Sequence, residues 1–268
     1  MTLPLGQGLN IGGMTRDALS VRGLRKLYEE QVVLDGVDLS VGAGEVCALL
    51  GPNGAGKTTT VRILSTLIRA DGGTARVLGH DVHSEADRVR RLIGLTGQFS
   101  AVDHLLSGEE NLLLIGRLLH LSAAERRARA AKLLERFDLI DAAKQSPATY
   151  SGGMARRLDI AMTLMGRPRL IFLDEPTAGL DPRSRRVMWQ LIRELVTDGV
   201  TILLTTQYLE EADQLADRIA VLDHGRVVAE GTPDELKRRL PGSHIRLQLA
   251  NYDALDAAAR LRPNGRRE

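Results

Sequence analysis

The chain has 268 residues, of which 36 are basic and 34 acidic, giving a formal net charge of +2. This length allows one large domain, or one domain with an insertion, around a sizeable core. The near-balance of charge excludes a strong general attraction to nucleic acid, so we expect no nucleic-acid partner. The single cysteine, Cys47, cannot form an internal disulfide, which fits a reducing, intracellular setting.

Residues 1–14 are rich in glycine and predict a flexible N-terminal extension. They have neither the basic start nor the cleavage pattern of a secretory signal, and Met14 is a candidate natural start. The most apolar stretch, NLLLIGRLLHL at 111–121, is interrupted by Arg117 and His120 and is too short to span a bilayer. We therefore expect no transmembrane segment.

Strand patterns alternate with helix patterns along most of the chain, which favours an α/β fold. The stretch LIFLD at 170–174 is apolar up to its last residue, as expected for a central strand buried on both faces. A helix is predicted at 57–68, and strands are predicted at 18–28, 37–41, 45–51, 74–78, 92–96, 169–173, 200–204 and 218–223.

Helix patterns dominate between about 100 and 165, which predicts a helical insertion at 99–165 in a core formed by 15–98 and 166–241. Ser122 and Glu125 have capping-box spacing at the start of one helix, and Asp181 followed by Pro182 marks the start of another. Residues 242–268 contain one strand-like piece, HIRLQLA, and predict a small C-terminal appendage.

The stretch GPNGAGKT at 51–58 matches the phosphate-binding P-loop pattern and lies between a predicted strand and a predicted helix. Its glycines allow backbone amides to surround the phosphates, Lys57 places a cation near the terminal phosphates, and the Thr58 hydroxyl can bind Mg²⁺. We therefore predict a bound nucleotide together with Mg²⁺, and the resemblance described below implies that the nucleotide is ATP. The predicted binding loop comprises Gly51, Pro52, Asn53, Gly54, Ala55, Gly56, Lys57, Thr58 and Thr59.

Two acids end the buried strand in RLIFLDEPTAGLDP, at the edge of the sheet where ligands of open α/β folds bind. Asp174 is predicted to hold the metal directly or through water. Glu175 is predicted to polarise the attacking water.

A second helix start suited to an anion is found in YSGGMARRLDIAM at 150–162. Ser151 can cap the helix, Gly152 and Gly153 allow a ligand to approach the backbone, and the first-turn amides have no partners within the helix. The alternative is a plain capped helix that binds nothing.

The stretches GPNGAGKTT, TGQ, YSGGMARRLDIA, LIFLDEPTAGLD and TTQYLEEADQLADRI, in this order, resemble the ATP-binding cassette of ABC transporters over about 18–235. YSGGM together with TTQYLEEAD most resembles the ATP-binding subunit of daunorubicin/doxorubicin-resistance exporters. The resemblance implies an ATPase with a P-loop NTPase α/β core, an antiparallel β subdomain and an inserted α-helical subdomain.

The resemblance also assigns roles to single residues. Tyr28 matches the aromatic that stacks on adenine, Gln98 the glutamine that reaches the metal, and Asp181 the aspartate that links two sites across a dimer. Gln207 stands where most cassettes have a histidine bonded to the γ-phosphate, and we expect it to contact that phosphate and support catalysis. The alternatives are an ordinary strand aromatic for Tyr28, a helix cap for Asp181 and an incidental loop residue for Gln207.

Each chain has one P-loop, so an enzyme that encloses two ATP molecules needs two copies. The resemblance implies a head-to-tail homodimer in which Ser151 of one chain completes the site of the other. It also implies a separate polytopic permease, a peripheral position at the cytoplasmic face of the membrane, and export of hydrophobic compounds such as drugs, antibiotics or lipids.

Permease contact is expected near an apolar rim formed by Phe99, Val102, Leu105 and Leu106, for most of which core packing is the alternative. The alternative function is a soluble ABC ATPase that acts on DNA or ribosomes. A single cassette, the lack of sustained heptads and the balanced charge disfavour that alternative.

Overall fold

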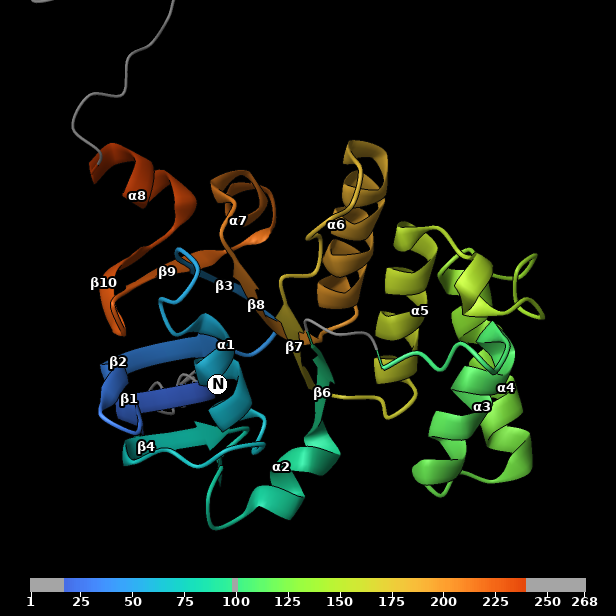
Figure 1. Cartoon of the computed structure of the whole chain (residues 1–268), viewed down its shortest axis with the longest axis horizontal. Coiled ribbons are helices and arrows are strands. Elements are labelled where there is room, and N and C mark those ends of the chain that lie inside the picture. Colours follow the sequence, from blue (N-terminus) through green and yellow to red (C-terminus); the bar gives the residue numbers. More distant parts are fainter. Residues whose placement is uncertain (1–16, 98–100, 240–268) are drawn as a thin grey trace, which may run out of the picture. The chain divides into compact units, whose positions relative to one another are not determined.

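A computed structural model describes residues 17–97 and 101–239 (Figure 1). The chain divides into two units, Met1–Pro233 and Asp234–Glu268. The described part of the second unit belongs to helix α8 (Pro233–Arg239). The predicted extension at 1–14 and the predicted appendage at 242–268 lie outside the described residues.

An antiparallel sheet is built from the N-terminal part of the chain, as predicted for the β subdomain. Its order is β2-β1-β4-β5. The strands are β1 (Asp17–Tyr28), β2 (Gln31–Gly42), β4 (Gly72–Val77) and the short β5 (His80–Asp81).

The second sheet has the order β10-β9-β3-β8-β7-β6 and is parallel except for β10, which pairs antiparallel with β9. All residues of β7 and β8 are buried, which confirms the prediction of a central strand at LIFLD. The strands are β3 (Val46–Leu50), β6 (Ile93–Thr96), β7 (Leu170–Asp174), β8 (Thr201–Thr206), β9 (Arg218–Asp223) and β10 (Arg226–Gly231).

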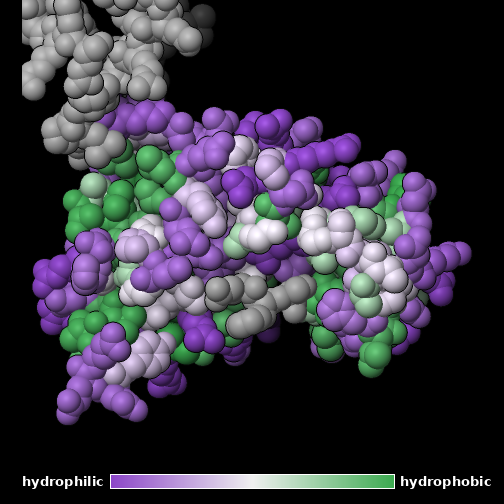
Figure 2. Space-filling view, turned by 45° about the horizontal axis from the view of Figure 1, so that its top comes forward, coloured by the Kyte–Doolittle hydropathy of each residue, from purple (hydrophilic) through white to green (hydrophobic). Residues whose placement is uncertain are grey.

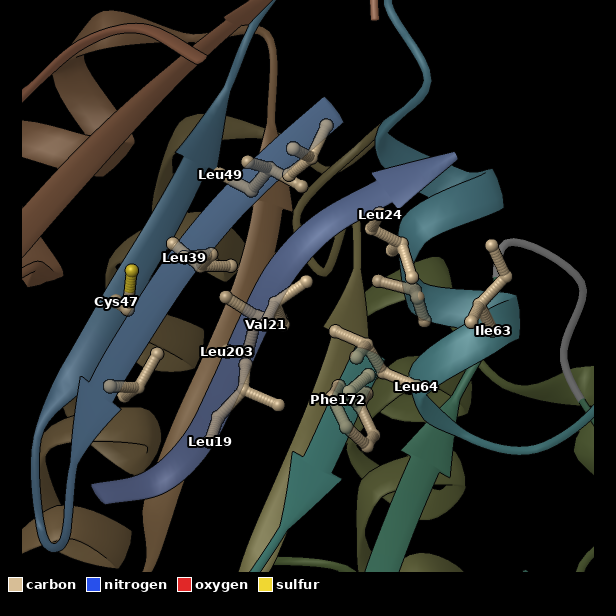
Figure 3. Packing of buried hydrophobic residues seen from close by; sticks show 14 of the residues in the cluster. Leu19, Val21, Leu24, Leu39, Cys47, Leu49, Ile63, Leu64, Phe172 and Leu203 are labelled. Carbon is tan, nitrogen blue, oxygen red and sulfur yellow. The ribbon is translucent and has the colours of Figure 1, made fainter. Parts of the chain in front are cut away.

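Helix α1 (Lys57–Leu64) contacts strands of both sheets. Figure 3 shows side chains of both sheets and of α1 packed into one cluster. The P-loop and the strand that ends in Asp174 are therefore supported by the same core. Labelled members are Leu19, Val21, Leu24, Leu39, Cys47, Leu49, Ile63, Leu64, Phe172 and Leu203.

Helices dominate the described part of the predicted insertion, although its limits at 99–165 stay a prediction. It contains α3 (Gly108–Leu118), α4 (Ala123–Arg136), the 3₁₀ turn η1 (Pro147–Thr149) and α5 (Gly152–Leu164). The other helices of the first unit are α2 (Ala86–Leu92), α6 (Pro182–Thr197) and α7 (Leu209–Leu215).

Within the described ranges, no helix has both the length and the apolarity needed to cross a membrane. The exposed large hydrophobic side chains are spread over several elements. On the face shown in Figure 2, hydrophobic residues form separate groups among hydrophilic ones.

The structure corrects several predicted boundaries. Strand β2 begins at Gln31 rather than at 37, α1 ends at Leu64 rather than at 68, and β5, β10 and α2 were not predicted. The predicted capping box at Ser122 is only half formed, because the Ser122 hydroxyl accepts from the Glu125 amide while the Glu125 carboxylate pairs with Arg129. A complete box caps α3 instead.

Candidate nucleotide-binding site

The candidate site lies where neighbouring parallel strands end. The P-loop follows β3, Gln207 follows β8, and Glu175 follows β7, and these strands are adjacent in the order β3-β8-β7. The Gly51 amide donates to the Thr206 carbonyl at 3.2 Å, which joins the P-loop to the segment that carries Gln207. The topology thus gathers residues from distant parts of the sequence at one edge of the sheet.

Glycine is required where the P-loop approaches other backbone closely. A side chain on Gly51 would place its Cβ 2.2 Å from the Leu222 carbonyl oxygen. Gly56, the N-cap of α1, has φ of 106° and packs against Leu34 of β2. Both glycines therefore allow the loop to run close to neighbouring strands just before the first turn of α1, whose amides are the groups that bind phosphate in a P-loop.

The Lys57 ammonium lies over the loop that precedes it. It donates to the carbonyls of Gly51 at 2.8 Å and Pro52 at 3.0 Å, and its side chain is 5% exposed. Its Nζ also lies 3.6 Å from Oε1 of Glu175. The structure therefore brings the predicted phosphate-binding cation beside the predicted catalytic acid.

The two predicted metal ligands from different motifs also meet. The Thr58 hydroxyl lies 3.3 Å from Oδ1 of Asp174, and Thr205 of β8 donates to the same oxygen. Asp174 is only 3% exposed. Its carboxylate is thus held at the sheet edge, next to the first turn of α1.

This arrangement fits Mg²⁺, which is bound through one or two protein oxygens together with phosphate oxygens and water. Among the described residues, no group of three or more His, Cys, Asp or Glu side chains is arranged to hold a metal ion. Thr58 and Asp174 would therefore share the ion with the nucleotide. The third predicted ligand, Gln98, lies outside the described residues.

Tyr28 ends β1, at the hairpin whose second strand packs on the P-loop through Leu34. The Tyr28 side chain is 42% exposed, and Lys26 Nζ lies 5.4 Å from its ring centroid. Its predicted contact with adenine stays a prediction. Gln207 is also exposed, directly after the Thr206 carbonyl that binds the P-loop.

Ser151 and Asp181 both act as helix caps. The Ser151 hydroxyl accepts from the Met154 amide at 3.2 Å, and the Asp181 carboxylate accepts from the amides of Arg183 and Ser184. Gly153 and Ser184 are in contact, since a Cβ on Gly153 would lie 2.7 Å from the Ser184 hydroxyl. The two helix starts therefore lie together, while Figure 1 shows α5 and α1 on different sides of β7.

The sequence did not identify the buried pair Arg156 and Asp159 on α5. Arg156 Nη1 lies 3.1 Å from Oδ2 of Asp159. Burial raises the pKa of the Asp159 carboxyl and lowers the pKa of the Arg156 guanidinium, while their mutual attraction opposes both shifts. The only signal in the sequence was the Arg-x-x-Asp spacing within a helix that is otherwise apolar after its first turns.

The sequence also gave no signal for Glu211, a buried acid in the first turn of α7. Its Oε1 accepts from the Thr177 hydroxyl at 2.7 Å and from the Trp189 indole at 3.3 Å. Thr177 belongs to the loop after Glu175, so Glu211 ties that loop to the helix that follows Gln207.

Comparisons with known proteins agree with this geometry. The family model for the ABC transporter matches residues 34–178. The daunorubicin/doxorubicin resistance ATP-binding protein of Streptomyces peucetius is 57% identical over 244 residues, which are 91% of this chain and 74% of that protein. The chain belongs to the ABC transporter family.

Further similarities agree with this membership. The Nod factor export ATP-binding protein I of Ralstonia nicotianae is 45% identical over 81% of this chain and 68% of that protein. A solved dimeric ATP-binding cassette, in a post-hydrolysis state with ADP and phosphate bound, is 28% identical with a TM-score of 0.71. That similarity covers 80% of this chain and 98% of the solved chain. This ABC chain is an ATPase with the cassette fold.

Proposed function

We propose that this ABC ATPase drives a separate polytopic permease that exports hydrophobic compounds such as drugs, antibiotics or lipids. The observation that carries the proposal is the 57% identity, over 91% of the chain, to a drug-resistance ATP-binding protein. The similarity to a Nod factor export protein also favours export over work on DNA or ribosomes.

The position of each residue in the proposed site suggests its role in hydrolysis. Lys57 would neutralise charge on the terminal phosphates, and Thr58 and Asp174 would hold Mg²⁺. The ion supplies further positive charge where negative charge develops on the phosphates. Glu175 accepts a hydrogen bond from the attacking water and orients it toward the γ-phosphate.

The proposed enzyme is a head-to-tail homodimer. Ser151 and the amides at the start of α5 then bind the γ-phosphate of the ATP held by the partner's P-loop, which receives a second helix N-terminus. The separation of α5 from α1 in the single chain supports this arrangement. Asp181 lies beside the start of α5, as its proposed role across the dimer requires.

The permease is proposed to contact the start of the helical region, at the cytoplasmic face of the membrane. Leu105 is 93% exposed and Leu106 is partly exposed, so both are candidate contacts. Val102 is 7% exposed and packs inside, which is the alternative of core packing rather than a place in the rim. Phe99 lies outside the described residues.

Inverted membrane vesicles give a direct test. Vesicles are prepared from cells that naturally produce the chain, after its gene is replaced by the wild-type or the Glu175→Gln form. We expect ATP-dependent uptake of doxorubicin or a fluorescent lipid with the wild type only. Equal uptake with Glu175→Gln, or no ATP-dependent uptake of either class of compound with the wild type, would contradict the proposal.

A further inference from the structure

A single buried guanidinium, that of Arg156 on α5, binds three backbone carbonyls on two separate segments. Its Nη1 donates to the Gly97 carbonyl at 2.9 Å, its Nη2 to the Asp174 carbonyl at 2.9 Å, and its Nε to the Pro176 carbonyl at 3.1 Å. The side chain is 12% exposed. The planar fork of arginine suits such a contact, because its donors point in fixed, different directions.

Asp159, one turn further along α5, compensates the buried charge. Its Oδ2 pairs with Arg156, its Oδ1 accepts from the Ala101 amide at 3.2 Å, and its side chain is 4% exposed. A buried ion pair persists only where the remaining donors and acceptors are also satisfied. The hydrogen bonds to Gly97 and Ala101 meet that requirement.

Two of the carbonyls bound by Arg156 belong to the residues on either side of Glu175. Glu175 itself has φ of 48°, in the left-handed region that a residue with a side chain rarely occupies. Such a conformation persists only when surrounding contacts hold it. The Glu175 amide donates to the Thr205 hydroxyl at 3.0 Å. Arg156 donates to the flanking carbonyls of Asp174 and Pro176.

Arg156 lies on the helix that begins at Ser151, so it joins that helix directly to the loop containing Glu175. We propose that Arg156 is a positioning residue, which fixes the backbone on both sides of Glu175 and so aligns its carboxylate for hydrolysis. This inference rests on the proposed role of Glu175 in orienting the attacking water.

The consequence is a specific kinetic defect. Releasing the two carbonyls leaves the P-loop intact, so ATP affinity should change by about threefold or less. A displacement of about 1 Å at a reacting group costs roughly 100-fold in rate, so turnover should fall about 10- to 100-fold. This separation of affinity from turnover is not expected of a residue that only stabilises the fold.

The test is a double-mutant cycle with Glu175→Gln, using single-turnover hydrolysis of radiolabelled ATP and direct measurement of ATP binding. If Arg156 acts through Glu175, then Arg156→Gln lowers turnover in the wild type. The same change has less than about a twofold further effect in the Glu175→Gln background. Arg156→Lys keeps the charge but loses the planar fork, so it should recover only part of the turnover.

Arg129→Gln is the matched control. Arg129 is similarly buried, at 15% exposed, and binds a carboxylate, that of Glu125, together with a single backbone carbonyl, that of Met165. It should lower thermal stability without the selective loss of turnover. If Arg156→Gln does not fold, Arg156→Lys takes its place in the cycle, because it also loses the fork that binds the Asp174 and Pro176 carbonyls; its smaller loss of turnover should likewise be absent in the Glu175→Gln background.

Turnover within twofold of wild type in Arg156→Gln, or an equal further loss in the Glu175→Gln background, would overturn the inference. So would a parallel loss of ATP affinity. The proposed role of Glu175 fails separately, if Glu175→Gln alone retains wild-type turnover.

Discussion

At the scale of single residues, the site combines the expected P-loop chemistry with one unusual position. Gln207 follows the strand between the P-loop strand and the strand of Asp174, and the preceding carbonyl accepts from the Gly51 amide. The resemblance leads us to expect a histidine there. A glutamine amide can still donate to a phosphate oxygen, but it carries no charge and does not titrate near neutral pH.

Gln207→Ala should lower ATP turnover roughly five- to tenfold, because one neutral hydrogen bond to the phosphate is worth about 1 kcal/mol. ATP affinity should change less. Gln207→His should remain active and acquire a dependence of rate on pH between about 6 and 8, where imidazole titrates, whereas the wild type stays nearly flat. Steady-state ATPase assays across this range, with the permease present, measure both effects. Full activity in Gln207→Ala would show that Gln207 has no part in hydrolysis.

At the scale of elements, helix α3 illustrates how local signals define one boundary. Ser107 accepts from the Glu110 amide, and the Glu110 carboxylate accepts from the Ser107 amide at 2.8 Å. These two bonds satisfy two amides that the helix leaves unpaired. The hydrogen bond from the Ser107 amide is the main cause that lowers the pKa of Glu110 below its ordinary value of 4.5.

Glu110→Gln should lower the free energy of unfolding at pH 7, because the charged cap is stronger than a neutral one. A carboxyl group with a lowered folded-state pKa contributes stability above its unfolded pKa and loses that contribution as pH falls through the folded value. The difference between wild type and variant should therefore shrink below pH 4.5. Urea unfolding at several pH values measures this difference in the free energy of unfolding. Glu109→Gln is the control, because it removes a charge from the same turn. A difference that is constant with pH would contradict the assigned cap.

Much of the secondary structure could be predicted, and the failures have local physical causes. Asp35-Gly36 has the composition of a turn, but Gly36 has φ of 81° and is skipped in the pairing of β1 with β2, so it forms a bulge and the strand continues. Helix α1 ends early because Thr66 adopts φ of 67°, a conformation that the sequence does not announce with a glycine.

The candidate site was predictable where motif spacing carried the chemistry. Lys57, Thr58, Asp174 and Glu175 belong to two continuous stretches, and the structure brings those stretches together. Arg156 was not predictable, because its partners are backbone carbonyls 18, 20 and 59 residues away. Any residue type can supply a carbonyl, so no sequence pattern records such a contact.

At the scale of the whole first unit, one hydrophobic cluster supports both sheets, α1 and the strand that ends in Asp174 (Figure 3). Phe172 lies on that strand and is fully buried. A loss of packing at Phe172 therefore lowers the stability of the core and weakens the support of the site together.

Phe172→Ala should lower the free energy of unfolding by about 3–5 kcal/mol, as expected for a buried aromatic truncated without replacement. Leu118→Ala is the control, because Leu118 is an exposed hydrophobic residue and its loss should cost less than about 0.5 kcal/mol. Urea unfolding followed by circular dichroism compares the two. Similar effects of both variants would contradict the assigned core.

The central claim is that each ATP lies between the P-loop of one chain and the Ser151 helix start of another. The most direct measurement mixes two variants, Ser151→Arg and Lys57→Ala, and follows ATP hydrolysis. Each variant alone should be nearly inactive, although Ser151→Arg should still bind ATP through its unchanged P-loop.

Mixing equal amounts should restore about a quarter of wild-type activity, since half of randomly formed dimers are mixed and each mixed dimer has one intact site. Recovery at about that level is the predicted result. No activity beyond the sum of the separate variants, or normal hydrolysis by Ser151→Arg alone, would show that the site is complete within one chain.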